Sequence, residues 1–585
     1  MKFSTLTILF IVTASLIVSG CGDSRETSTR ESKASDSSTL GVIKSLAEAD
    51  VPESEIALDQ EFFEKPEEFA LGGLGMAPER GLSITVDGAP VMLSEESEEA
   101  LPQRESFNTE SYDHVTDNSF LSVIQNPLST FSIDVDTASY SNVRRFLNEG
   151  QLPPKGAVRI EELINYFSYD YAPPTNGKPF ATYVEIAACP WAETHQLAKV
   201  AIKGKVFEEQ ERPPVNLVFL LDVSGSMNSP NKLPLLKTAM SMLVKELSEV
   251  DYVGICVYAG RAGVVLPPTS CEQKSDILAA LDKLEAGGST AGGEGIKLAY
   301  SLAEKHFVKG HINRVILCTD GDFNVGVTSQ SELVDLIEAK AKGGIFLTVL
   351  GFGMGNYKDS MLEKLADKGN GNYGYIDTIR EAQKILVEQM SGTLITIAKD
   401  VKIQVEFNPA KVGAYRLLGY ENRLLRAEDF NDDKKDAGEI GAGHTVTALY
   451  ELVPPGEEIE NLPKVDPLKY QKTQEATDAE LTETTHADEW LTLKLRYKQP
   501  DGDTSDLIEI AVKADTITPF EQSSADFQFT ASVAGFGMLL RDSQYKGTTH
   551  YDAIKEWGIR SKGEDRNGYR AEYLQLVDVA KSLAK

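Results

Sequence analysis

The sequence predicts an α/β protein with a doubly wound, mostly parallel sheet, flanked by β-rich and helical regions. Residues 215–221 form a continuous apolar run, which is typical of a strand buried on both faces. From there to residue 395, further strand-like runs alternate with segments whose apolar residues recur at helical spacing. Strands that alternate with helices indicate a parallel sheet. We therefore expect one α/β domain at 213–395.

The individual elements of this domain follow from the same patterns. A tight turn at Gly260-Arg261 leads into 262–266, which we expect to be an antiparallel edge strand. The other predicted strands are 215–221, 252–258, 314–318, 345–350 and 373–376. The predicted helices are 235–250, 296–307, 331–341, 360–368 and 381–390.

The segment before the domain shows weaker but distinct patterns. Residues 142–148 and 160–167 predict short helices, separated by a glycine and a pair of prolines. Residues 182–186 alternate between apolar and polar side chains, as a strand does. We expect an N-terminal extension at 119–212.

The segment after the domain changes to strands with one solvent-exposed face. Apolar side chains alternate with polar ones in 401–407 and again in 491–497. The second run leads into Asp501-Gly502, a hairpin-type turn. From about residue 520 the pattern becomes helical. We expect a C-terminal β-rich plus helical domain at 396–585.

The first twenty residues resemble an export signal. Lys2 precedes a mostly apolar run at 8–18, which is too short to span a bilayer as a permanent helix. The run ends in a Val-Ser-Gly-Cys tetrapeptide that resembles a bacterial lipoprotein processing site. Cleavage there leaves Cys21 free to carry acyl chains. We expect a signal peptide at 1–20 and an exported, lipid-anchored protein.

A strongly acidic segment follows the predicted anchor. Residues 22–113 are rich in Ser and Glu and contain 22 acidic and 7 basic side chains. Such a segment cannot bury enough apolar surface to offset its ordering entropy, so we expect a disordered tether at 21–118. Gly22 stands where an Asp would favour inner-membrane retention in enteric bacteria, which points to the outer membrane.

The overall charge excludes one class of partner. The chain has 58 Lys and Arg against 89 Asp and Glu, a formal net charge of −31. Binding to nucleic acid requires clustered cations that neutralise phosphates. We therefore expect no nucleic acid partner.

Five oxygen-bearing side chains converge at one end of the predicted sheet. Asp222, Ser224 and Ser226 follow the first strand and alternate with other residues, so a tight loop can point all three at one spot. Thr290 lies in a glycine-rich loop before a helix, and Asp320 ends the strand expected beside the first. Ligand sites in open α/β sheets lie at such strand ends. A set of oxygen ligands suits Mg²⁺ or Mn²⁺ rather than zinc.

These residues resemble a known site. The region is similar to a von Willebrand factor type A domain, and the five side chains match its metal-ion-dependent adhesion site. The resemblance implies that Ser224, Ser226 and Thr290 contact the metal directly, while Asp222 and Asp320 act directly or through water. It also implies an open coordination position, which a carboxylate of a protein partner fills.

The resemblance extends beyond this domain. Residues 131–140, followed by 142–146, resemble the N-terminal extension of a family of bacterial envelope lipoproteins. Members of that family combine this extension with a type A domain and a C-terminal domain of unknown role. The match covers roughly residues 120–585. It implies the fold and a bound metal ion, but it implies little about the biological role.

Two enzyme-like motifs leave weaker alternatives. Asp134 and Asp136, in Asp-Val-Asp-Thr, resemble the nucleophile motif of haloacid-dehalogenase-type phosphatases. That chemistry needs the first Asp at the tip of a buried strand, whereas the predicted parallel sheet begins about eighty residues later. The glycines of 351–355 lie between a strand and a helix, but a lone glycine cluster is a weak nucleotide signal. We expect a tight turn there and no nucleotide.

The preferred hypothesis is a non-enzymatic binding module on the cell envelope. Mg²⁺ (or Mn²⁺) would join the domain to an Asp or Glu of an unidentified protein ligand, and the lipid anchor would hold the protein at the membrane. A structural envelope scaffold that binds no ligand, and a phosphohydrolase that uses Asp134 and Asp136, stay open as alternatives.

Overall fold

The computed structural model describes residues 112–584, except for 134–135, 176, 208–211, 290–291, 322–329, 354–358, 436, 458–485, 487 and 515. The predicted signal peptide, Cys21 and the predicted tether up to residue 111 therefore lie outside the described residues. Within the described part of the chain, no helix combines the length and the apolar character needed to cross a membrane.

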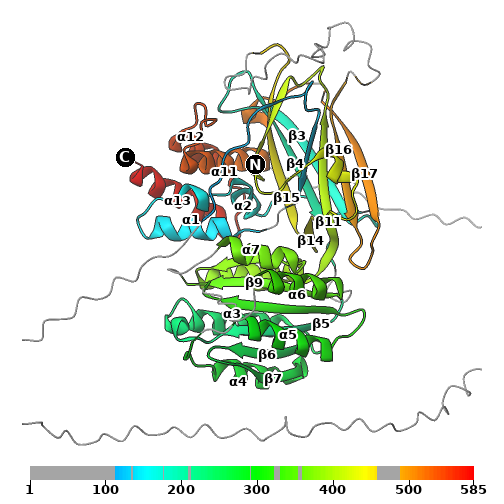
Figure 1. Cartoon of the computed structure of the whole chain (residues 1–585). Coiled ribbons are helices and arrows are strands. Elements are labelled where there is room, and N and C mark those ends of the chain that lie inside the picture. The colour runs from blue at the N-terminus through cyan, green and yellow to red at the C-terminus, as the bar shows by residue number, and fades with distance from the viewer. Residues whose placement is uncertain are drawn as a thin grey trace, which may run out of the picture. The chain divides into compact units, whose positions relative to one another are not determined.

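A six-stranded sheet forms the centre of the α/β domain (Figure 1). Its strands stand in the order β10-β9-β8-β5-β6-β7, and each neighbouring pair is parallel except β6 and β7. The strands are β5 (Val215–Asp222), β6 (Tyr252–Tyr258), β7 (Ala262–Ser270), β8 (Ile312–Thr319), β9 (Ile345–Phe352) and β10 (Tyr373–Ile376). This confirms the doubly wound, mostly parallel sheet and its antiparallel edge strand.

Helices cover both faces of this sheet, because alternate side chains of the buried strands point to opposite sides. Leu217 of β5 belongs to the same buried cluster as Leu236, while Val218 packs in the cluster of Ile296 on the other face. The helices on the first face are α3 (Leu233–Glu246), α4 (Lys274–Asp282) and α8 (Ile379–Gln383). Those on the second are α5 (Gly292–Lys305), α6 (Gln330–Lys342) and α7 (Asp359–Lys368).

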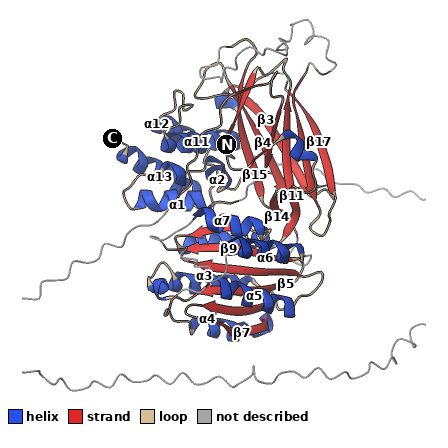
Figure 2. Cartoon of the chain, in the orientation of Figure 1, coloured by secondary structure: helices blue, strands red, loops and turns tan. Residues whose placement is uncertain are grey.

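A β-sandwich is built from strands that lie before and after the α/β domain in the sequence (Figure 2). One sheet has the order β1-β12-β15-β4-β3, and the other has β13-β2-β11-β16-β17 with β14 paired to β11. The first sheet contains β1 (Leu121–Ser122), β3 (Phe180–Ala188), β4 (Gln196–Gly204), β12 (Ala414–Leu418) and β15 (Thr445–Val453). The second contains β2 (Leu128–Ser132), β11 (Thr396–Phe407), β13 (Leu424–Leu425), β14 (Gly438–Gly441), β16 (Glu489–Lys498) and β17 (Ser505–Lys513).

The two flanking segments are therefore interleaved in space. Strand β2 pairs with β11, and β4 pairs with β15, so the extension at 119–212 and the region at 396–585 share both sheets. The hairpin expected at Asp501-Gly502 joins β16 to β17. The α/β domain is inserted into the sandwich between β4 and β11.

A layer of helices covers the outer face of the first sandwich sheet. Its buried cluster joins Leu197 of β4 and Leu449 of β15 to apolar side chains of the helices, among them Phe529 and Tyr573. The helices are α1 (Ala138–Asn148), α2 (Ile160–Asn165), α11 (Ala525–Arg541), α12 (Tyr551–Arg560) and α13 (Tyr569–Leu583). Helices α1 and α13, from opposite ends of the described chain, lie in contact (Figure 1).

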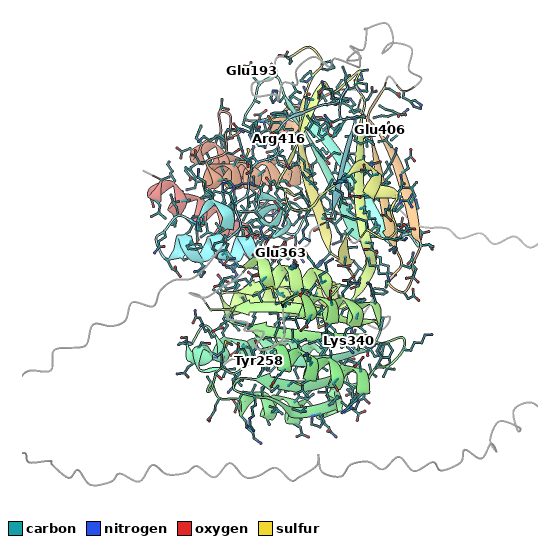
Figure 3. The ribbon with its side chains drawn as sticks, viewed as in Figure 1. Glu193, Tyr258, Lys340, Glu363, Glu406 and Arg416 are labelled. Carbon is teal, nitrogen blue, oxygen red and sulfur yellow. The ribbon has the colours of Figure 1, made fainter. Side chains whose placement is uncertain are left out.

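Buried ion pairs connect the α/β domain to this scaffold. Glu363 of α7 accepts hydrogen bonds from Arg159 at 2.7 Å and from Arg423 at 3.0 Å (Figure 3). Asp136 is 5% exposed, and its carboxylate accepts from the Tyr373 amide at 2.9 Å. Arg423 lies 3.4 Å from the other oxygen of Asp136. Asp136 thus holds the extension against the sheet, while Asp134 lies outside the described residues.

The helix predicted at 381–390 is wrong as a single element. The structure divides this segment into α8, a π-helix η6 (Lys384–Glu388) and α9 (Met390–Leu394). The Lys384 ammonium donates to the Tyr166 carbonyl at 2.6 Å and lies 2.9 Å from the centroid of the Tyr166 ring. Burial lowers the pKa of Lys384 to about 7. The break therefore coincides with a buried lysine held by the extension.

Candidate metal site

A tight loop after β5, residues 222–228, carries the first three predicted ligands and is called the serine loop below. The loop leaves the sheet at Asp222 and forms a short 3₁₀ helix, η4 (Gly225–Asn228). The Val223 amide donates to the Tyr258 carbonyl at 3.0 Å, and Tyr258 belongs to the neighbouring strand β6 (Figure 3). The loop therefore stays attached to the sheet edge while its side chains turn toward the crevice.

Asp222 is completely buried at the end of β5. Its Oδ1 accepts a hydrogen bond from the Ser224 amide at 2.9 Å, whereas Oδ2 is buried and has no well-aligned hydrogen-bond donor among the described residues, although the Tyr258 hydroxyl interacts with this carboxylate. The pKa of Asp222 is raised to about 6, mainly by burial and to a smaller extent by the negative charge of Asp320, while interactions with Ser224 and the Tyr258 hydroxyl oppose the increase. An unsatisfied buried carboxylate oxygen requires a cation or a donor to compensate it.

The two serine hydroxyls lie side by side. Ser224 Oγ and Ser226 Oγ are 3.0 Å apart. Ser224 is buried, whereas Ser226 is exposed, so the pair reaches from the protein interior to the solvent. The alternating spacing therefore brings both hydroxyls to one spot, as the sequence predicts.

Asp320 reaches the same edge from the adjacent strand. Strand β8 pairs in parallel with β5, with Cys318 opposite Leu221, and Asp320 follows directly after β8. Asp320 is completely buried, and its Oδ2 accepts a hydrogen bond from the Lys232 ammonium at 2.8 Å. The strand order thus brings the two predicted carboxylates to one end of the sheet, where the helical connections diverge.

The glycine-rich loop approaches the serine loop through backbone contacts. Gly287 donates to the Val223 carbonyl at 2.8 Å, and Gly225 donates to the Gly288 carbonyl at 3.0 Å. Gly288 has a φ of +82°, a conformation that favours glycine. Thr290 itself lies outside the described residues, so its predicted role as a ligand stays a prediction.

The described donor set fits a hard divalent cation. It provides two carboxylates and two hydroxyls, with one carboxylate oxygen left without a hydrogen bond. Oxygen ligands of this kind suit Mg²⁺ or Mn²⁺. Among the described residues, no group of three or more His, Cys, Asp and Glu side chains forms a metal cluster of another kind.

Lys232 is the residue at this site that sequence reasoning missed. It directly precedes α3, and its side chain is 11% exposed. Its aliphatic stem packs against Gly353, where a Cβ would lie 2.3 Å from Lys232 Cε. Lys232 makes no side-chain capping hydrogen bond, and no motif around it marks it as a site residue, so only the fold reveals its proximity to Asp320.

A groove of about 690 Å³ borders the serine loop. Leu233 and Thr238 of α3 form one wall, and residues 282–286 at and after the end of α4 form the other. Asn228, two positions after Ser226, lies at one end. The rim includes the exposed carboxylates of Asp282 and Glu285. The groove therefore begins beside the serine loop, and none of the predicted metal ligands that the structure describes lines it.

Three family models match this chain. The model of the von Willebrand factor type A domain matches residues 216–388, and a second von Willebrand factor model matches 106–199. The model described as "Uncharacterized protein YfbK, C-terminal" matches 392–583. Type A domains are a family of metal-binding modules for adhesion and protein interaction, and they are usually non-enzymatic.

Several known proteins are similar to this chain in sequence. The uncharacterized protein YfbK of Escherichia coli (strain K12) is 46% identical over 479 residues, which cover 81% of each chain. The uncharacterized protein sll0103 of Synechocystis is 29% identical over 203 residues, or 34% of this chain and 47% of that protein. Human inter-alpha-trypsin inhibitor heavy chain H4 is 30% identical over 166 residues, or 27% of this chain and 18% of that protein.

Solved structures resemble parts of the chain. The type A protein from Catenulispora acidiphila covers 68% of this chain and 89% of its own, with a TM-score of 0.38 and 16% identity. Proximal thread matrix protein 1 of the mussel byssus, with a zinc-occupied MIDAS motif, matches over 30% of this chain and 45% of its own length, with a TM-score of 0.26 and 25% identity. At these TM-scores the structural similarities carry no argument about function.

Because it is 46% identical to the E. coli protein over four fifths of both chains, this chain belongs to the YfbK family, whose central module is a von Willebrand factor type A domain.

Proposed function

We propose that the protein binds a protein partner through a divalent metal ion held by its type A domain. Asp222, Ser224, Ser226, Thr290 and Asp320 would hold the ion, which is Mg²⁺ or, in its place, Mn²⁺. The ion would supply a positive centre with an open coordination position for an Asp or Glu carboxylate of the partner. No catalytic step is assigned to the site.

One observation supports this proposal more than any other. Asp222 Oδ2 is buried without a hydrogen bond at the strand end where Ser224 and Ser226 present their hydroxyls 3.0 Å apart. A cation that binds there satisfies the orphaned oxygen, and exposed Ser226 leaves a path from the solvent.

Thermal unfolding of the purified chain tests the metal. Ligand at about 100 times its dissociation constant stabilises the folded state by about 2.7 kcal/mol, so we expect Mg²⁺ to raise Tm by a few degrees relative to EDTA. Ser226→Ala removes one ligand and should abolish most of this rise. Ser241→Ala is the matched control, because its hydroxyl donates to the Lys237 carbonyl on α3 rather than to the site. If Mg²⁺ leaves the Tm of the wild-type chain unchanged, the proposal is overturned.

Capture from an envelope extract tests the partner. Immobilised wild-type chain should retain a protein in Mg²⁺ and release it in EDTA, and Thr290→Ala should fail to retain it in either buffer. When an acidic residue of the partner binds the metal, neighbouring residues of the partner can contact the groove beside the serine loop. Retention that survives both EDTA and Thr290→Ala would instead support the structural scaffold.

We also propose that Cys21 anchors the protein in the cell envelope, at the outer membrane. The proposal rests on the apolar run at 8–18 and the Val-Ser-Gly-Cys tetrapeptide. Cells grown with an alkyne-labelled fatty acid should label the wild-type protein but not Cys21→Ala. Density separation of the two membranes should then place the labelled protein with the outer one. A label that persists in Cys21→Ala would exclude this anchor.

A further inference from the structure

The metal site contains a built-in cation. The Lys232 ammonium lies 2.8 Å from Asp320 Oδ2, and the side chains are 11% and 0% exposed. Its backbone is fixed as well, because the Lys232 amide donates to the Ser229 carbonyl at 2.9 Å and its carbonyl accepts from the Leu236 amide at 2.8 Å. A charge with so little contact with water interacts strongly with its neighbours.

The turn after β9 keeps this lysine in place. A Cβ on Gly353 would lie 2.3 Å from Lys232 Cε and 2.6 Å from Cγ, so only glycine leaves room for the stem. Gly353 also has a φ of +76°, and its carbonyl accepts a hydrogen bond from the buried Tyr375 hydroxyl. Two separate segments of the fold therefore confine the ammonium beside Asp320.

The positive charge of Lys232 changes the net charge of the metal-loaded site. Asp222 and Asp320 together carry two negative charges, which one divalent ion neutralises. Lys232 adds one positive charge, so the metal-loaded site carries a net charge of about +1. A carboxylate that enters the open position then makes the site neutral. Without the lysine, the same carboxylate would leave a buried negative charge, which is unfavourable.

We propose that Lys232 makes the metal site selective for anions, because it leaves the metal-loaded site positive, and that it weakens metal binding by the same charge. This inference rests on the proposed metal site and deepens it. Lys232 is a specificity-determining residue that acts through Asp320 and through its charge, and it is not itself a metal ligand. The two effects have opposite signs, which a merely structural role for the lysine would not produce.

The test compares neutral replacements of Lys232 in the full chain. Lys232→Gln keeps a hydrogen-bond donor for Asp320 but removes the charge, and Lys232→Met removes both. Lys237→Met is the matched control, because this lysine lies in the same part of the chain, five residues further on in α3, but donates to the carbonyls of Asp282 and Leu284. Circular dichroism with Mn²⁺ present checks that each variant is folded.

Two affinities are measured on each variant. Titration with Mn²⁺, followed by the electron paramagnetic resonance of the free ion, gives the metal affinity. Paramagnetic relaxation of the acetate methyl protons in the Mn²⁺-loaded protein gives the carboxylate affinity. We expect Lys232→Gln and Lys232→Met to bind Mn²⁺ roughly tenfold more tightly and acetate roughly tenfold more weakly than wild type. Lys237→Met should leave both within twofold.

The outcomes separate this inference from the proposed function. Wild-type protein that binds no Mn²⁺ at millimolar concentration would overturn the metal site and the inference with it. Wild-type protein that binds Mn²⁺ normally, with weaker or unchanged binding in both Lys232 variants, would overturn the inference alone and make Lys232 a structural support of Asp320. Acetate affinity that stays constant while Mn²⁺ affinity rises would also overturn it, because anion selectivity would then lie elsewhere.

Discussion

Arg144 Nη2 and Glu381 Oε2 lie 2.7 Å apart in a buried pair that joins α1, the first helix of the described chain, to α8 of the α/β domain. The same guanidinium contacts Asp377 and, at 3.2 Å, Glu572 of α13. One arginine therefore connects three segments that lie far apart in the sequence. Because Glu381 and Asp377 are almost excluded from water, solvent cannot replace the charge that Arg144 supplies to them.

Replacing Arg144 with Met should destabilise the protein strongly. The substitution leaves Glu381 and Asp377 next to each other without the guanidinium, and loss of one member of a buried ion pair costs about 3–5 kcal/mol. Urea unfolding should report this as a lower midpoint. Adding Glu381→Gln to Arg144→Met should recover part of the loss, because it removes one of the uncompensated charges.

Arg566→Met is the matched control for this prediction. Arg566 pairs with Glu564 at 3.1 Å, but the two side chains are 80% and 75% exposed. Exposed pairs contribute about 0–1 kcal/mol, so the midpoint should hardly move. Equal midpoints for Arg144→Met and Arg566→Met would show that the buried pair does not hold the three segments together.

The α/β domain and the serine loop could be predicted because their signals are local. The buried run of β5 and the spacing of Asp222, Ser224 and Ser226 each lie within a dozen residues. The alternation of strands and helices also predicts that β8 runs parallel to β5, although it does not fix their register. Short-range patterns of this kind need no knowledge of distant partners.

The interleaved sandwich and Lys232 could not be predicted, because distant parts of the chain determine them. Alternation identifies β11 as a strand, but nothing in that run specifies that Ile403 pairs opposite Phe131 of β2. In the same way, Lys232 and Asp320 lie 88 positions apart, and their ion pair exists only once α3 and β8 are packed. The π-helix at Lys384 likewise depends on Tyr166.

His444 should make the stability of the protein sensitive to acid. Its Nε2 is buried without a hydrogen bond among the described residues, and its ring packs against Gly392, where a Cβ would lie 2.1 Å from the ring. Burial, and then the positive charges of Lys203 and Lys384, lower the pKa of His444 to about 4. The ring is thus neutral in the folded protein across a range in which it is charged in the unfolded chain.

The sign of the effect follows from proton binding. Between about pH 6.5 and pH 4 the unfolded chain binds a proton at His444 and the folded protein does not, so the free energy of unfolding falls as the pH falls. The shift in the pKa of His444 lowers the free energy of unfolding by roughly 3 kcal/mol at pH 4 relative to neutral pH. Unfolding midpoints of wild type and His444→Gln, measured from pH 7 to pH 4, should converge as the pH drops. His114→Gln, a change at an exposed histidine, should keep a constant offset from wild type; parallel curves for His444→Gln would contradict the prediction.

Filling the groove beside the serine loop should separate partner binding from metal binding. Thr238 is exposed on the wall that α3 contributes, and Thr238→Trp would occupy much of the 690 Å³ groove without touching a predicted ligand. Displayed peptides selected on the wild-type chain in Mg²⁺ should be enriched in Asp or Glu, and they should bind Thr238→Trp at least tenfold more weakly, an estimate based on the loss of one well-packed contact.

The Mg²⁺ affinity of Thr238→Trp should equal that of wild type, because the metal is held by the loop and not by the groove. Lys245→Trp places the same side chain at an exposed position near the other end of α3, outside the groove, and should leave peptide binding intact. Selected peptides that bind Thr238→Trp as tightly as they bind wild type would show that the partner does not use this groove.

The exposed carboxylates of Asp282 and Glu285 at the groove further predict that selected peptides carry Lys or Arg near their acidic residue.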